Sequence, residues 1–206
     1  MKFVHAADMH LDRPFVTLGG NKEMIKRKKL EQKYVFKKLI DYVKSNNVEL
    51  LFLSGDIFEQ KFITNDTINF LISSFEEIEN TKVFISPGNH DPKIKSSPYV
   101  TSAWPQNVYI FDGTISKIEI KNISIYGLGF EDYTMDTDIV STIELDKNAI
   151  NILVTHGTLD GAGSKYHDIK SAWLKDFDYV ALGHIHLKKI DDSKIIYPGS
   201  LTARRV

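Results

Sequence analysis

Five short apolar runs in this chain each end in a cluster of polar residues, and this pattern constrains the fold more than any other feature. The runs are rich in valine and isoleucine, as buried strands are, and lie at residues 2–7, 48–53, 82–86, 150–155 and 179–182. The carboxyl ends of strands in open α/β sheets line the ligand crevice. The sequence therefore predicts an α/β protein in which the five polar clusters converge on one site.

Helical periodicity separates several of these runs. Residues 22–45 and 64–79 carry apolar residues at helical spacing, and Thr64 or Asn65 can cap the second pattern. Shorter helices are expected over residues 136–147 and near residues 169–174. The apolar face of the first helix is expected to consist of Ile25, Leu30, Tyr34, Leu39, Ile40 and Val43.

The middle of the chain alternates polar and apolar residues instead. Residues 115–128 show this alternation, and Lys121-Asn122 separates two arms, which predicts a hairpin. Residues 194–197 predict a further strand that ends in a Pro-Gly turn. No repeat or linker interrupts the sequence, so we expect a single α/β domain with two packed sheets over residues 1–206.

Composition restricts the chemistry. The chain has no cysteine, which excludes disulfides, thiolate zinc sites and iron–sulfur clusters, so a metal must be held by oxygen and imidazole nitrogen. A net charge of −1 gives no overall attraction for nucleic acid, so local charge must attract any DNA. No signal peptide or membrane-spanning run is expected. The expected location is the cytoplasm, with no membrane partner.

Histidines are concentrated in the polar clusters. A lone histidine is usually a hydrogen-bonded core residue or a surface group. That interpretation does not explain five histidines at strand ends together with two aspartates and an asparagine. The set predicts a metal site with too many ligands for one ion, and its histidines are His10, His90, His156, His184 and His186.

In order along the chain, these clusters resemble the five motifs of the calcineurin-like metallophosphoesterases. The motifs are Asp8-x-His10, Gly55-Asp56, Gly88-Asn89-His90-Asp91, His156-Gly157 and Gly183-His184-x-His186, and the match extends over residues 3–200. Within that superfamily, residues 5–12 and the segment Tyr197-Pro198-Gly199-Ser200 are most similar to SbcD-type DNA repair exonucleases. The resemblance implies a four-layer α/β/β/α fold, a two-sheet β-sandwich flanked by helices.

The resemblance also implies a dinuclear metal site and the roles of its residues. One ion is expected on Asp8, His10, Asp56 and His186, and the other on Asp56, Asn89, His156 and His184. Such ligands suit manganese, iron or zinc, and the SbcD-type resemblance favours Mn²⁺. Asp56 would bridge the ions, which activate a hydroxide for attack on a phosphodiester. His90, outside the ligand set, is expected to assist departure of the leaving oxygen.

Five further residues lie near the motifs. Asp91 could orient His90 or hold its loop, and Glu59 could support His90 or lie at the surface. Arg13 could bind substrate phosphate, although a solvated arginine is the more common case. His5 is expected to pack behind the site, and His167 is expected in a surface loop.

A stripe of lysines on the first predicted helix is a candidate DNA contact. Lysines at three- and four-residue steps could neutralise phosphates, but a solvated helix face is the more ordinary explanation. The stripe consists of Lys22, Lys26, Lys29, Lys33 and Lys37.

Three functions follow from these observations. The first is a two-metal phosphodiesterase that hydrolyses DNA, and the second is a phosphatase or phosphodiesterase acting on small molecules or nucleotides. The third, a non-catalytic scaffold, ranks last because all seven expected ligands are present. SbcD-type proteins also carry a DNA-capping region and a segment that docks an SMC-type ATPase. The sequence ends at Val206 without either, so an ATPase is the least supported of the expected partners.

Overall fold

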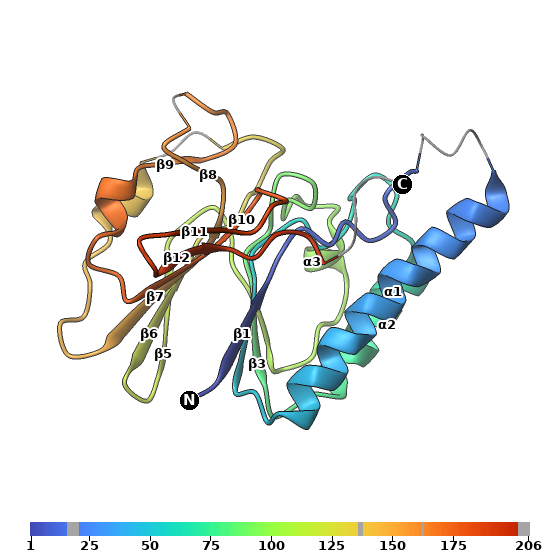
Figure 1. Cartoon of the computed structure of the whole chain (residues 1–206), viewed down its shortest axis with the longest axis horizontal. Helices are drawn as coiled ribbons and strands as arrows, with labels where there is room; N and C mark the ends of the chain where they lie inside the picture. Colours follow the sequence, from blue (N-terminus) through green and yellow to red (C-terminus); the bar gives the residue numbers. More distant parts are fainter. Residues whose placement is uncertain (16–20, 136–137, 162, 202–206) are drawn as a thin grey trace.

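Two β-sheets lie side by side at the centre of the computed structural model, which describes residues 1–15, 21–135, 138–161 and 163–201 (Figure 1). The first sheet has four strands in the order β1-β2-β3-β4, and all neighbours are parallel. Its strands are β1 (Phe3–Ala6), β2 (Leu50–Leu53), β3 (Lys82–Ile85) and β4 (Val108–Ile110). Ala6 pairs with Leu53 and Leu53 with Ile85, so the first three strands end at the same level.

The second sheet has six strands in the order β11-β12-β10-β7-β6-β5. Its central strands β6, β7, β10 and β12 are parallel, while β5 and β11 are antiparallel edge strands. The strands are β5 (Ser116–Ile120), β6 (Ile123–Gly127), β7 (Ile150–His156), β10 (Tyr179–Gly183), β11 (Lys189–Asp191) and β12 (Ile195–Tyr197). A separate pair, β8 (Thr158–Leu159) and β9 (Asp168–Ile169), follows β7.

Helices cover the outer face of the four-stranded sheet (Figure 1). Helix α1 (Lys22–Ser45) begins where the Asn21 side chain accepts a hydrogen bond from the Met24 amide. Helix α2 (Asn65–Glu76) begins at Thr64, whose hydroxyl caps the Thr67 amide. Both starts agree with the sequence prediction, because a cap is a local interaction. A one-turn helix, α3 (Pro98–Thr101), begins at Ser97.

Alternation along β2 shows how the layers form. Leu51 and Leu53 belong to the core beneath α1 and α2, whereas Leu50 and Phe52 belong to the core between the two sheets. All four are at most 1% exposed. A third core lies on the outer face of the six-stranded sheet, beneath the 3₁₀ helices η2 (Ile139–Thr142) and η3 (Ser171–Leu174). The predicted two-sheet sandwich flanked by helices is therefore confirmed.

Two of the predicted helices are wrong in type. Residues 136 and 137 lie outside the described residues, and the rest of the expected 136–147 helix contains only the four-residue η2. The sequence there includes Ile139, Val140, Thr142 and Ile143, whose β-branched side chains disfavour a helix, and Ile143 is already extended. The helix expected near residues 169–174 is the 3₁₀ helix η3.

The predicted apolar face of α1 is wrong at two positions. Leu30 and Tyr34 are 58% and 62% exposed, while Gln32, Phe36, Ile40 and Val43 are buried. The first turns of α1 extend beyond the sheet, so part of their apolar surface has no neighbouring layer among the described residues (Figure 1). None of the described helices combines the length and the apolar character that a membrane span requires.

Candidate metal centre

The polar clusters converge where the two sheets meet. Asp8 and His10 follow β1, Asp56 follows β2, and Asn89 follows β3. His156 ends β7, and His184 and His186 follow β10 in the neighbouring sheet. The structure thus brings together all seven residues that the sequence analysis selected as ligands.

Four of these residues form a first group of donors. One side-chain donor atom from each of Asp8, His10, Asp56 and His186 lies within 4.8 Å of the others. His10 Nε2 is 3.6 Å from Asp56 Oδ2 and 3.3 Å from His186 Nε2. Asp8 and Asp56 are at most 1% exposed, so their charges are poorly screened by water.

A second group lies on the other side of Asp56. His156 Nε2 is 3.5 Å from Asp56 Oδ2 and 3.1 Å from Asn89 Oδ1. His184 Nδ1 is 3.3 Å from the same Asn89 oxygen. One carboxylate oxygen, Asp56 Oδ2, therefore faces donors of both groups.

The imidazoles are held by hydrogen bonds at their other nitrogens. His10 Nδ1 lies 3.0 Å from Glu59 Oε1, and His156 Nδ1 lies 2.8 Å from the Ser54 carbonyl oxygen. These oxygens accept a hydrogen bond from Nδ1–H, which leaves Nε2 of both rings with a lone pair for a metal. Burial lowers the pKa of His156 to about 4, against the opposite effect of the Ser54 carbonyl, so this ring is neutral at neutral pH.

This donor set fits divalent cations. Imidazole nitrogens, carboxylates and an amide oxygen, gathered within a few ångströms, are ligands that manganese, iron and zinc accept. The hydrogen bonds on the outer nitrogens are of the kind that orients histidines toward a metal. The centre is therefore a candidate metal site on its own geometry.

The backbone at the site is conformationally unusual. Four non-glycine residues have positive φ angles, between +48° and +100°: Asp8, His10, Asp56 and His184. Such conformations cost free energy and cluster at functional sites. The two sheets also approach closely here, since a Cβ at Gly183 would lie 1.7 Å from the Ser54 carbonyl oxygen.

Asp91 forms hydrogen bonds with the loops of the site rather than orienting the His90 side chain. Its carboxylate is fully buried and accepts hydrogen bonds from the backbone amides of Asp56, Ile57 and Gly88. The Tyr99 hydroxyl donates a further hydrogen bond at 2.7 Å. Burial raises the pKa of Asp91. Of the two roles left open by the sequence, the structure supports the structural one.

Glu59 is the residue that contacts His90. Its Oε2 lies 2.9 Å from His90 Nδ1, while Oε1 contacts His10. Burial favours the neutral form of Glu59, but hydrogen bonds from His10 and His90 outweigh it and lower its pKa to about 2. The hydrogen bond to Glu59 raises the pKa of His90. Glu59 is thus not a surface residue, and it links a candidate ligand to the candidate acid.

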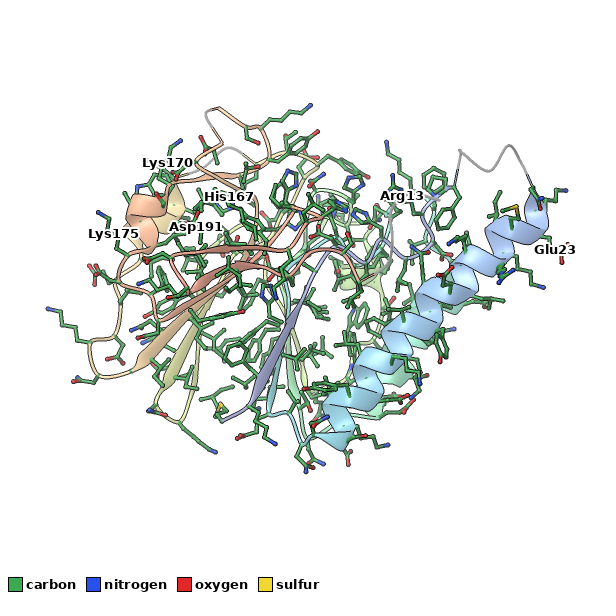
Figure 2. All side chains as sticks on the ribbon, viewed as in Figure 1. Arg13, Glu23, His167, Lys170, Lys175 and Asp191 are labelled. Atoms are coloured by element: carbon green, nitrogen blue, oxygen red, sulfur yellow. The ribbon has the colours of Figure 1, made fainter. Side chains whose placement is uncertain are left out.

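The two remaining histidines lie behind the site. His5 packs there as expected, with Nε2 3.1 Å from Ser54 Oγ and Nδ1 3.1 Å from the Tyr179 hydroxyl. The expectation for His167 is wrong, since it is fully buried (labelled in Figure 2). Its Nδ1 lies 3.1 Å from the carbonyl oxygen of His156. The sequence held no local signal for this burial, because it depends on the chain returning to the end of β7, where the Thr158 amide donates to the His167 carbonyl.

The basic residues that the sequence offered as substrate contacts differ in their surroundings. Arg13 lies on the loop between β1 and α1, partly exposed, and its role in binding substrate stays a prediction (Figure 2). In the lysine stripe, Lys29 pairs with Asp12 at 3.1 Å and Lys33 lies over the Phe70 ring. Lys37 pairs with Glu77 and Asp41. Three of the five lysines therefore contact residues of this chain, which favours the ordinary explanation for the stripe.

A cavity of about 300 Å³ opens beside His90. Glu59, Asn89 and His90 line it, so it adjoins the candidate metal centre. Three further lining residues were not selected from the sequence, because they belong to segments without a motif: Lys61, Tyr133 and Tyr166.

Comparisons with known proteins agree with this geometry. The model of the calcineurin-like phosphoesterase family matches residues 1–188. The chain is 28% identical over 225 residues to the uncharacterized metallophosphoesterase YhaO of Bacillus subtilis (strain 168), covering all of this chain and 54% of that relative. It thus spans about half the length of that relative. The crystal structure of TT1561 of Thermus thermophilus has a similar fold, with a TM-score of 0.58 and 12% identity over 97% of this chain and 89% of that one.

Proposed function

This chain belongs to the calcineurin-like phosphoesterase family, and we propose that it is a dinuclear phosphodiesterase that hydrolyses DNA. Family membership and the donor cluster together make it a metal-dependent phosphoester hydrolase. One observation carries the dinuclear proposal. Asp56 Oδ2 lies 3.6 Å from His10 Nε2 and 3.5 Å from His156 Nε2, so one oxygen is shared by two groups of donors.

In the proposed site the two groups hold one ion each. Asp8, His10, Asp56 and His186 hold the first ion, and Asp56, Asn89, His156 and His184 hold the second. Two such cations supply charge neutralisation for the phosphate oxygens and a water with a lowered pKa. We propose manganese as the native metal; iron and zinc are compatible with the same ligands.

His90 is the proposed general acid. Its Nδ1 is engaged by Glu59, which leaves Nε2 to donate a proton to the leaving oxygen. The hydrogen bond to Glu59 raises the pKa of His90, so the proton is retained closer to neutral pH. The backbone amide of His90 donates to Asp56 Oδ1 at 2.9 Å, which holds this residue beside the centre. Arg13 is a proposed contact for a substrate phosphate.

Support for DNA as the substrate comes from sequence. Residues 5–12 and 197–200 are similar to SbcD-type exonucleases. A second candidate, hydrolysis of nucleotide or small-molecule esters, is favoured by the cavity beside His90. Its volume of about 300 Å³ is at the lower end of the range for small-molecule sites.

The test combines metal binding with a substrate panel. Metal-free protein is titrated with Mn²⁺ by calorimetry and then assayed on a nitrophenyl phosphodiester, a nitrophenyl phosphomonoester, and single- and double-stranded DNA. We expect two ions per chain and faster hydrolysis of the diesters, DNA included. At most one ion at saturation contradicts the dinuclear site. A preference for monoesters or nucleotides, with DNA untouched, supports the second candidate instead.

A further inference from the structure

The cavity beside His90 has a wall that the metal chemistry does not use. Glu59, Asn89 and His90 form the part nearest the candidate centre, and Lys61, Tyr133 and Tyr166 form the rest. Tyr133 is 37% exposed, although a large aromatic side chain favours burial. An exposed ring and a lysine in the wall of a catalytic cavity point to a ligand with both a planar and a charged part.

Tertiary contacts bring this wall together from distant segments. Lys61 lies between β2 and α2, Tyr133 follows β6, and Tyr166 precedes β9. The two tyrosine segments meet at a bridge in which the Met135 amide donates to the Lys165 carbonyl at 3.0 Å. Lys61 Nζ lies 5.4 Å from the centre of the Tyr133 ring, in a cation–π contact that restrains the ring.

Both tyrosine rings have a lysine ammonium over them, Lys61 at Tyr133 and Lys165 at Tyr166, but the rings differ in their contact with the candidate centre. The Tyr166 ring packs against His184, with 5.4 Å between ring centres, and so belongs to the support of the candidate centre. For Tyr133 the structure gives the contact with Lys61. Tyr133 is therefore the ring in this wall that is placed to contact a bound substrate.

The position of the wall defines which part of a substrate it meets. His90 is the proposed donor of a proton to the leaving oxygen, so a cavity beside it lies on the leaving side of the phosphate. Its volume suits one nucleoside rather than a length of duplex. Nucleobases stack on aromatic side chains whatever their sequence, and a nearby ammonium attracts the attached phosphate.

We propose that Tyr133, restrained by Lys61, stacks on the base of the leaving nucleoside and so selects phosphodiesters whose leaving group carries a planar ring. This inference rests on the proposed function, because it assigns the leaving side from the role of His90. It adds a specificity residue to the site without changing the metal chemistry.

The experiment uses three dinucleotides that differ only in their bases. The first is thymidylyl-thymidine, and in the other two an abasic residue replaces one of the two thymidines. Each is assayed with Mn²⁺-loaded wild-type protein and with Tyr133→Ala and Tyr133→Phe. Tyr34→Ala, which removes an exposed tyrosine from α1, is the control. The products identify which nucleoside leaves.

Tyr133→Ala should lower kcat/KM for thymidylyl-thymidine by about five- to a hundredfold, the range expected for one stacked base. The loss should be at most about twofold for the dinucleotide without a base on the leaving side. Tyr133→Phe, which keeps the ring, and Tyr34→Ala should behave like the wild type. Calorimetric binding of thymidylyl-thymidine to the metal-free protein should weaken in Tyr133→Ala alone.

Two results overturn the inference. One is an equal loss for all three dinucleotides in Tyr133→Ala, and the other is a wild-type protein that does not favour a base on the leaving side. If the wild type hydrolyses none of the three, the proposed phosphodiesterase function fails. The binding measurement on metal-free protein then still decides whether Tyr133 contacts a base.

Discussion

The two sheets supply chemically different halves of the candidate centre. The four-stranded sheet provides the carboxylates and the amide, Asp8, Asp56 and Asn89, together with His10. The six-stranded sheet provides imidazoles only, from His156, His184 and His186. One half therefore carries the carboxylates and the other contributes only imidazole nitrogens, and a site for divalent cations exists only where the halves meet.

The halves also differ in how they are held. Within the four-stranded half, the buried carboxylate of Asp91 fixes the loops, and the partly buried carboxylate of Glu59 fixes the rings. The six-stranded half is held partly from across the boundary. The Ser54 carbonyl accepts from His156, and the Asp8 carboxylate accepts from the His184 amide at 3.0 Å. The histidine half is thus positioned by its neighbour, and substitutions at four residues test how the two halves work.

Asp56→Asn should have the largest effect, since Asp56 Oδ2 faces donors of both halves. Loss of its charge should abolish binding of at least one ion and lower hydrolysis at least about a thousandfold. Calorimetry with Mn²⁺ and a nitrophenyl diester assay measure both effects. Asp41→Asn, the same change on the exposed side of α1, is the control. A variant that keeps two ions and most of its activity would contradict a bridging role.

His90→Asn should separate chemistry from metal binding within the four-stranded half. The variant should keep both ions and lose about a hundredfold or more in kcat, as expected for loss of a general acid. The deficit should shrink on a nitrophenyl diester, whose leaving group departs without a proton. If the deficit is equal on the nitrophenyl diester and on a phosphodiester without an activated leaving group, His90 is not the acid. If the variant loses an ion, His90 is a ligand or supports one.

His167 offers a test confined to the six-stranded half. Its Nδ1 donates to the His156 carbonyl, and the amide of asparagine can replace that donor, whereas the longer glutamine places its amide elsewhere. His167→Gln should weaken one of the two ions about tenfold, and His167→Asn less than about threefold. Calorimetric titration with the metal gives the affinity for each ion and so distinguishes the two variants. Equal weakening by both variants would reduce His167 to a packing residue.

His5 tests the boundary between the sheets with the smallest expected effect. Burial lowers its pKa to about 3, against a backbone hydrogen bond to Leu182, while an unfolded histidine titrates near pH 6.5. The unfolded chain therefore binds the proton more readily. The contribution of neutral His5 to the free energy of unfolding is therefore complete above about pH 6.5 and is lost as the pH falls toward 3.

Replacing His5 with phenylalanine removes this titration. Between about pH 6.5 and pH 4, the free energy of unfolding of metal-free His5→Phe should fall less steeply than that of the wild type. The difference should be about 1.4 kcal/mol per pH unit, the value for one proton. Urea unfolding at four pH values measures it. Identical slopes would show that His5 is protonated in the folded protein.

Local sequence was sufficient for much of the fold. The start of α1 at Asn21 and of α2 at Thr64 follows from caps that act within one turn. The β5–β6 hairpin follows from alternation on either side of Lys121, whose φ is +56°. The prediction of a helix over residues 136–147 was wrong because it relied on apolar spacing and left out the lower helix propensity of β-branched residues.

Several supporting contacts of the site lay beyond such reasoning. The sequence offered Glu59 as a possible support of His90, but its second contact, with His10, depends on segments that meet only in the folded chain. His167 is buried because the segment before β9 returns to the end of β7, where its Nδ1 contacts the His156 carbonyl. Tyr133 and Tyr166 share a cavity because a bridge at Met135 joins their two loops.

The sequence by itself determined the positions of most strands along the chain, the polar residues at their ends and the family to which these motifs belong. It did so because strand propensity, capping and motif spacing are encoded within a few residues. Tertiary structure decided which imidazole nitrogen faces the centre, which carboxylate is shared and which side chains line the cavity. These depend on the docking of two sheets whose contacting residues, such as Ser54 and His156, are 102 positions apart.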